Sequence, residues 1–244
     1  MYRSEVQTRP FPPRAGDPVA LQFTIRDGEG RPVPQLQLAH EKPMHLMIVS
    51  KDLDHFAHVH PSSEGDGFRL VHRFDEGGDY LLVADYQQPG RGQVIDRHQI
   101  HVEGVSRPAV SVEESPRTQR TDDLELTLRT EGELRAGEAA MLHFDAVDMK
   151  TGSPVADFEP YLGAKAHFMV LSADGEDFIH VHAVEEPGIP SRVSAHAVFP
   201  RPGLYKLWAQ MQRRGEVLTI PFVLRVAAPG AKAAHEGGHS HHRH

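Results

Sequence analysis

The same spacing of three histidines occurs twice in this sequence. In the first copy the gaps between them are 13 and 2 residues, and the three are His45, His58 and His60. The gaps recur 122 residues later in a second set, which is formed by His167, His180 and His182. Imidazole is the commonest protein ligand for metal ions, and three converging imidazoles are one way to hold zinc or copper. The spacing therefore predicts one three-histidine metal site in each half of the chain.

Additional ligands are available near each set. The first half offers His40, five residues before its set, and Asp85, on a later strand. At the equivalent positions the second half has Leu162 and Gln210, and its extra candidate is His196. A carboxylate such as Asp85 either binds the ion itself or orients a ligand histidine by accepting a hydrogen bond from its second ring nitrogen. The sequence is compatible with both roles for Asp85.

The repeat extends beyond the histidines and defines two halves. The segment Arg-Ala-Gly-Asp at residues 14–17 recurs as Arg-Ala-Gly-Glu at residues 135–138. Each is followed by a predicted strand in which apolar and polar residues alternate. Short strands separated by turn signals predict an all-β chain of two tandem immunoglobulin-like or cupredoxin-like β-sandwich domains related by internal duplication. We expect the first sandwich at residues 1–104, a linker at 105–120, the second sandwich at 121–228 and a disordered histidine-rich tail at 229–244.

Strand geometry gathers the histidines of each set. Residues two apart in a strand face the same side of the sheet, so His58 and His60 project together while Val59 points into the core. The short connection between residues 50 and 55 is typical of a hairpin, which would bring His45 beside this pair. The same reasoning applies to the second set.

Composition excludes several classes of function. The net charge is -8 and no basic stripe is interleaved with aromatic residues, so we expect no nucleic-acid partner. No apolar run reaches the length of a transmembrane helix. The chain has no cysteine, which excludes disulfides and thiolate metal sites. Five of the 18 histidines fall in the last ten residues, a composition that binds metal ions loosely.

Residues 40–53, continued by Phe-Ala-His-Val-His-Pro at 56–61, resemble the signature of a group of poorly characterised, usually exported bacterial tandem β-sandwich proteins. The second half agrees with this signature at residues 178–182, 194–196 and 199–210, and the resemblance covers roughly residues 15–226. It implies a periplasmic or otherwise exported envelope protein that handles copper or another heavy metal. It supplies no catalytic residue. Because the first residues lack the apolar core of a signal peptide, a cytoplasmic location is the alternative.

The favoured hypothesis is a protein that binds, buffers or delivers a metal ion through one three-histidine site per repeat. Copper is favoured over zinc because the affinity of such sites for divalent ions peaks at copper. The expected partners are the metal ion and a metal-delivery protein. Two alternatives stay open: a mononuclear metalloenzyme, either a copper oxidoreductase or a metal-dependent hydrolase, and an adaptor module whose histidines are incidental.

Overall fold

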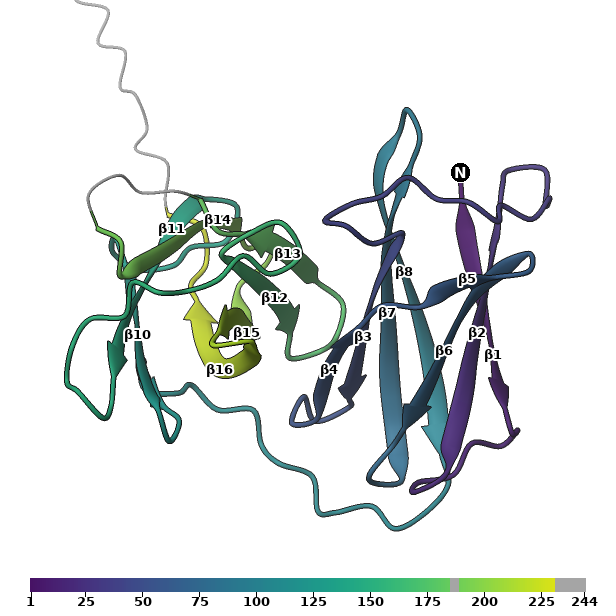
Figure 1. The fold of residues 1–244 in the computed structure, drawn as a ribbon, viewed down its shortest axis with the longest axis horizontal. Helices are drawn as coiled ribbons and strands as arrows, with labels where there is room; N and C mark the ends of the chain where they lie inside the picture. The colour runs from purple at the N-terminus through teal and green to yellow at the C-terminus, as the bar shows by residue number, and fades with distance from the viewer. Residues whose placement is uncertain (185–188, 231–244) are drawn as a thin grey trace, which may run out of the picture.

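The structure is a computed structural model that describes residues 1–184 and 189–230. Within these ranges the chain forms sixteen strands and no helix, arranged as four sheets of four strands (Figure 1). The sheets build two β-sandwiches, one from each half, so the predicted all-β tandem fold is confirmed. In the described part of the chain, no helix is long and apolar enough to cross a membrane.

The first sandwich pairs two antiparallel sheets. One sheet has the order β1-β2-β6-β5 and contains β1 (Arg3–Arg9), β2 (Pro18–Arg26), β6 (Gly67–Arg73) and β5 (Ser62–Glu64). The other has the order β4-β3-β7-β8 and contains β4 (Phe56–Val59), β3 (Met44–Ser50), β7 (Gly78–Gln88) and β8 (Gly92–Val102).

The second sandwich repeats this plan. Its first sheet has the order β14-β11-β10-β9 and contains β14 (Arg192–Val198), β11 (Ala139–Asp148), β10 (Leu124–Thr130) and β9 (Thr118–Arg120). Its second sheet has the order β13-β12-β15-β16 and contains β13 (Phe178–His182), β12 (Ala166–Ser172), β15 (Gly203–Arg213) and β16 (Glu216–Val226). The sheet β13-β12-β15-β16 thus matches β4-β3-β7-β8 strand for strand.

Each sandwich has its own hydrophobic core, built from alternate residues of its strands. In β3, Leu46 and Ile48 point into the first core, and in β12 Phe168 and Val170 point into the second. The residues between them must therefore face the opposite side of each sheet. This outer side carries the histidines of both sets.

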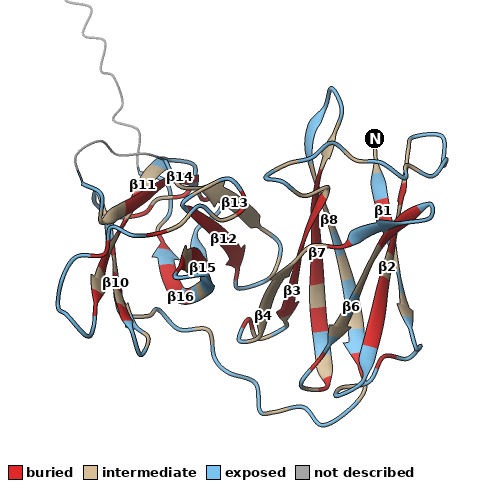
Figure 2. Cartoon of the chain, viewed as in Figure 1, coloured by how far each residue is buried: buried red, intermediate tan, exposed pale blue. Residues whose placement is uncertain are grey.

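The outer sides of β4-β3-β7-β8 and β13-β12-β15-β16 pack against each other. Met47 and Val83 of the first half share one buried cluster with Met169 and Trp208 of the second half. The ring of Phe56 stacks on Trp208 with 4.4 Å between centroids. As a result β3 and β12 are buried on both faces, and Figure 2 colours β12 and all but the end of β3 as buried. The histidines therefore lie at an interface between the two sandwiches.

The segment that connects the sandwiches is held against both of them. Val110 donates its backbone N–H to Asp52 of the first half, and Ser115 exchanges hydrogen bonds with Val223 of the second half. The second sandwich begins with β9 at residues 118–120, inside the range expected for the linker, because this strand pairs with β10. Of the tail expected at 229–244, residues 231–244 lie outside the described part of the chain.

Candidate metal centre

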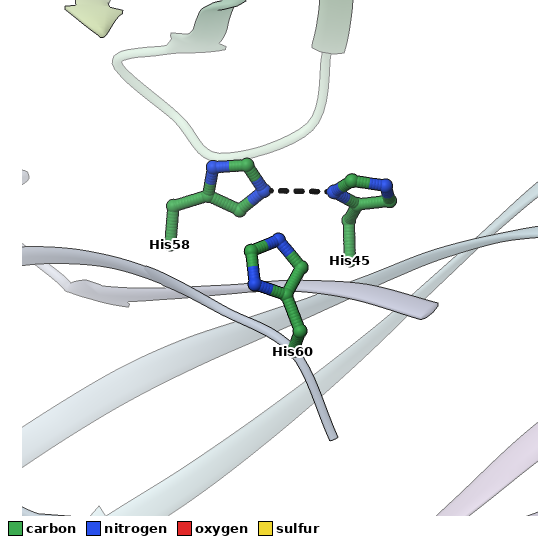
Figure 3. A group of neighbouring side chains, drawn as sticks. All are labelled: His45, His58 and His60. Atoms are coloured by element: carbon green, nitrogen blue, oxygen red, sulfur yellow. Dashed lines mark hydrogen bonds between the residues drawn. The ribbon is translucent and has the colours of Figure 1, made fainter. Parts of the chain in front are cut away.

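The structure brings the three histidines of each set together. In the first trio (His45, His58 and His60) one potential ligand atom of each residue lies within 4.8 Å of the others (Figure 3). The second trio (His167, His180 and His182) satisfies the same criterion. The hairpins between β3 and β4 and between β12 and β13 place the first histidine beside the other two, as the spacing predicts.

A tight turn in the preceding loop orients the first histidine of each trio. In the first half the Ala39 carbonyl accepts a hydrogen bond from Nε2 of His45 at 3.0 Å. In the second half the Tyr161 carbonyl accepts one from Nε2 of His167 at 2.8 Å. Both turns need two consecutive residues with positive φ, and they are His40 and Glu41 in one turn and Leu162 and Gly163 in the other. Each first histidine therefore carries its proton on Nε2 and turns the lone pair of Nδ1 toward the trio.

The opposite sandwich orients the second histidine of each trio. Nδ1 of His58 donates to Oε1 of Gln210 at 2.8 Å, and Nδ1 of His180 donates to Oδ2 of Asp85 at 2.8 Å. Both acceptors are buried, and the side chain of Asp85 is only 6 % exposed. Since Nδ1 of each second histidine is protonated, its Nε2 presents a lone pair to the trio.

These contacts leave two lone pairs facing each other in each trio. Nδ1 of His45 lies 3.0 Å from Nε2 of His58, and Nδ1 of His167 lies 3.4 Å from Nε2 of His180. When both rings are neutral, neither nitrogen of such a pair carries a proton, because the single N–H of each ring is on its other nitrogen and donates to an oxygen there. A cation between the two nitrogens satisfies both lone pairs at once.

The third histidine of each trio adds an unsatisfied nitrogen. Nε2 of His60 and Nε2 of His182 are buried and have no hydrogen-bond partner among the described residues. One ring nitrogen of His60 faces the space between the other two rings (Figure 3). A buried polar atom without a partner costs about 1–3 kcal/mol, so natural proteins keep few of them. The donor set of each trio therefore fits a metal ion.

Burial keeps these imidazoles unprotonated. Desolvation lowers the pKa of His60 to about 3, and neighbouring imidazoles add to the effect. The same two causes lower the pKa of His182 to about 2, and desolvation lowers that of His167 to about 4. Desolvation also lowers the pKa of His58 well below its usual value of 6.5. Neutral imidazole is the form that binds metal, so the lone pairs are available at neutral and mildly acidic pH.

The two trios lie next to each other across the interface between the sandwiches. The ring centroids of His45 and His180 are 5.4 Å apart, and those of His58 and His167 are 6.2 Å apart. Together the trios form one cluster of histidines in which each half supplies one ligand set and orients part of the other. The sequence predicted two sets of three histidines, and the structure places these two sets side by side.

The other predicted ligands lie around the trios in three different ways. The ring of His40 lies 6.2 Å from that of His45 in its own repeat and stacks on His182 of the second repeat. Asp85 pairs with His45 in the strand ladder, while its carboxylate contacts His180 of the second repeat. Asp85 accepts a hydrogen bond from Nδ1 of His180, the geometry of a group that orients a histidine. His196 lies on β14, in the other sheet of the second sandwich, with an exposed side chain, so it does not join the second trio.

Sequence reasoning missed the role of Gln210 and the burial of the histidine-bearing face. A signal was present, because residues 44–49 and 166–171 are apolar at almost every position other than the histidine. Strands that are covered on both faces read as continuous apolar runs, whereas a half-exposed strand alternates. The runs indicate that something covers the outer face of each of these sheets.

Two cavities of about 660 and 560 Å³ lie elsewhere on the molecule. The first is lined by β1, the loop after it and β8, and the second by residues from both halves near Lys51 and Asp174. Neither cavity includes a residue of the trios, so neither brings a substrate-sized space beside the candidate metal ligands.

Comparisons with solved structures find proteins of low similarity. An α2-macroglobulin mutant from Salmonella matches with 15% identity and a TM-score of 0.31, over 93% of this chain and 15% of that one. Invasin, a bacterial integrin-binding protein, matches with 15% identity and a TM-score of 0.25, over 91% of this chain and 39% of that one. A two-domain fibronectin type III segment from chicken tenascin matches with 14% identity and a TM-score of 0.25, over 91% of this chain and 98% of that one. At these scores the likenesses carry no argument about function.

No curated protein matches the sequence. One family model does match, and it does so twice, over residues 2–104 and again over residues 119–228. Each match coincides with one β-sandwich and contains one histidine trio. The match covers most of the chain, so the protein belongs to the family described as a domain of unknown function (DUF8832), of which it contains two tandem copies.

Proposed function

We propose that this protein binds two copper ions, one at each histidine trio, and that it buffers or delivers them. The observation that carries the proposal is the convergence of lone pairs. In each trio two unprotonated ring nitrogens face each other, at 3.0 Å in the first trio and 3.4 Å in the second. A third buried nitrogen without a partner joins them. A shared proton satisfies only two such nitrogens, whereas a metal ion binds all three.

Copper is the preferred ion on chemical grounds. The trios offer neutral nitrogen ligands and the chain has no thiolate, a donor set that suits copper or zinc. Among divalent first-row ions the affinity of such ligands is highest for copper, so copper displaces zinc when both are present.

The test is the number of ions bound per chain. Full-length protein with the five tail histidines replaced by alanine is loaded with copper, dialysed against a weak chelator and measured by elemental analysis. We expect two ions per chain, and one after the double change His58→Ala plus His60→Ala. The double change His101→Ala plus His196→Ala removes two exposed histidines outside the trios and serves as the control. An unchanged copper content in the His58/His60 variant would rule the assignment out.

We also propose that the protein acts in the bacterial envelope. This location is supported by the resemblance of residues 15–226 to exported tandem sandwich proteins. Immunoblotting of periplasmic and cytoplasmic fractions from the native host tests it. Recovery of the protein with the cytoplasmic markers would contradict the proposal.

A further inference from the structure

The two trios have nearly the same geometry but receive different groups from the opposite sandwich. Asp85 and Gln210 stand at equivalent positions, since Asp85 pairs with His45 in the ladder between β3 and β7, and Gln210 pairs with His167 in the ladder between β12 and β15. Each reaches across the interface to the second histidine of the other trio. The second trio therefore receives a carboxylate, and the first receives a neutral amide.

The carboxylate of Asp85 is held in place by its surroundings. Gln93 donates its side-chain N–H to both oxygens of Asp85 at 2.9 and 3.0 Å, while His180 donates to one of them. Burial raises the pKa of the Asp85 carboxyl and the hydrogen bonds from Gln93 oppose this shift, while the three contacts together fix the direction of the group. A carboxylate behind a ligand histidine makes that ligand more basic and partly offsets the charge of a bound cation.

His40 adds a second difference between the trios. It belongs to the first repeat, yet its ring stacks on His182 with 3.6 Å between centroids and lies 5.7 Å from the ring of His167. The equivalent residue of the second repeat is Leu162, which has no ligand atom. The ring of His40 also lies 6.2 Å from that of His45, so His40 stands between the trios but packs most closely on the second one.

We infer that His40 and Asp85 complete the metal site of the second repeat, which makes it the tighter of two unequal copper sites. His40 turns out of its stack on His182 and supplies a fourth nitrogen ligand, while Asp85 orients and strengthens His180. The site of the first repeat keeps three neutral ligands, and its ion exchanges more readily. This inference rests on the proposed copper binding and assigns a resident role to one site and a transfer role to the other.

Two single-site proteins, both full-length with the tail histidines replaced, separate the sites. The change His58→Ala plus His60→Ala leaves the second site, and His180→Ala plus His182→Ala leaves the first. Copper(II) is titrated into each in competition with a chromophoric chelator. We expect the second site to bind at least about tenfold more tightly, the lower end of what an outer-shell partner contributes to metal affinity. Equal affinities in the two proteins would overturn the inference.

Substitutions copied from the opposite repeat then test each residue. In the second-site protein Asp85→Gln and the near-isosteric Asp85→Asn should each weaken binding by about 10- to 100-fold, and His40→Leu should weaken it as well. X-ray absorption should count four nitrogen ligands at the second site and three after His40→Leu. In the first-site protein Asp85→Asn should have no comparable effect, because the carboxylate orients His180 and not His58, and Gln210→Glu should strengthen binding.

Several outcomes separate this inference from the proposed function. If neither single-site protein binds copper, the proposed function fails. If both bind and Asp85→Asn weakens the two sites to the same extent, or weakens neither, then copper binding stands and the inequality is wrong. A second site that keeps its affinity and its ligand count after His40→Leu would remove His40 from the ligand set.

Discussion

At the scale of single residues, the central feature is that each trio fixes the protonation pattern of its rings. The carbonyls of Ala39 and Tyr161 each accept a hydrogen bond from the first histidine of a trio. The side chains of Gln210 and Asp85 each accept one from the second histidine of a trio. The remaining nitrogens converge with their lone pairs inward. This arrangement makes the metal-free protein sensitive to protons, because protonating any of these rings places an uncompensated charge in a buried cluster.

The metal-free protein should lose stability as the pH falls below about 6.5, the usual pKa of histidine. The pKa values of His60, His167 and His182 are lowered to about 3, 4 and 2, so between pH 6.5 and these values the unfolded chain binds protons that the folded chain does not. The free energy of unfolding is then largest above pH 6.5 and decreases toward acid pH. Each histidine contributes up to about 1.4 kcal/mol per pH unit, less where water screens the ring.

Urea unfolding of chelator-treated protein at several pH values between about 7 and 4.5 measures this slope. The variant His60→Ala should show a shallower slope, because one imidazole fewer takes up a proton on unfolding. A free energy of unfolding that stays constant over this pH range would contradict the lowered pKa values.

At the scale of elements, the turns before β3 and β12 set the direction of the first histidine of each trio. Gly163 in the second turn has a φ of +76°, in the left-handed region that disfavours side chains. The change Gly163→Ala should cost about 1 kcal/mol of stability and displace the Tyr161 carbonyl that holds His167. We expect the copper affinity of the second site to fall by up to about tenfold, as for loss of an outer-shell partner.

Gly132 provides the matched control for this change. Its φ is +93°, an added Cβ would meet no atom within 4 Å, and its turn joins β10 and β11, away from the trios. Gly132→Ala should cost a similar amount of stability and leave copper affinity unchanged. If both alanine variants reduce copper affinity equally, the turn does not act on the site through His167.

The sequence predicts the elements and the composition of each trio, for identifiable reasons. The alternation in residues 56–60 places His58 and His60 on one face, and the duplication marks the same positions in the second half. The contact between Asp85 and His180 could not be predicted from the sequence, because it joins residues that are 95 positions apart and belong to different repeats. Such a contact depends on how two sheets dock, which strand periodicity does not encode.

At the scale of the whole molecule, docking of the two sandwiches brings an orienting group to each histidine trio. Trp208 is central to the docked surface, where it is 3% exposed and stacks on Phe56. Because Asp85 and Gln210 act across this interface, separating the sandwiches removes an orienting group from each trio. Metal affinity and interdomain packing should therefore be coupled.

The change Trp208→Ala tests this coupling. It should destabilise the protein by roughly 3–5 kcal/mol, as buried Trp→Ala changes do, and should weaken copper binding at both sites together. Phe222→Leu, in the core of the second sandwich, is the control that perturbs stability without touching the interface. Copper titrations that give the same affinities for Trp208→Ala and the unchanged protein would show that each sandwich binds its ion alone.

The most direct test of the whole account is the electron paramagnetic resonance spectrum of the protein with copper(II) at both trios. The centroids of His45 and His180 are 5.4 Å apart, and with metal–nitrogen bonds of about 2 Å the two ions lie within about 12 Å of each other. We predict a dipolar-broadened spectrum from two ions per chain, which sharpens to that of a single isolated ion after His58→Ala plus His60→Ala. A spectrum of two magnetically isolated ions, or one that this double change leaves as it was, would contradict the account.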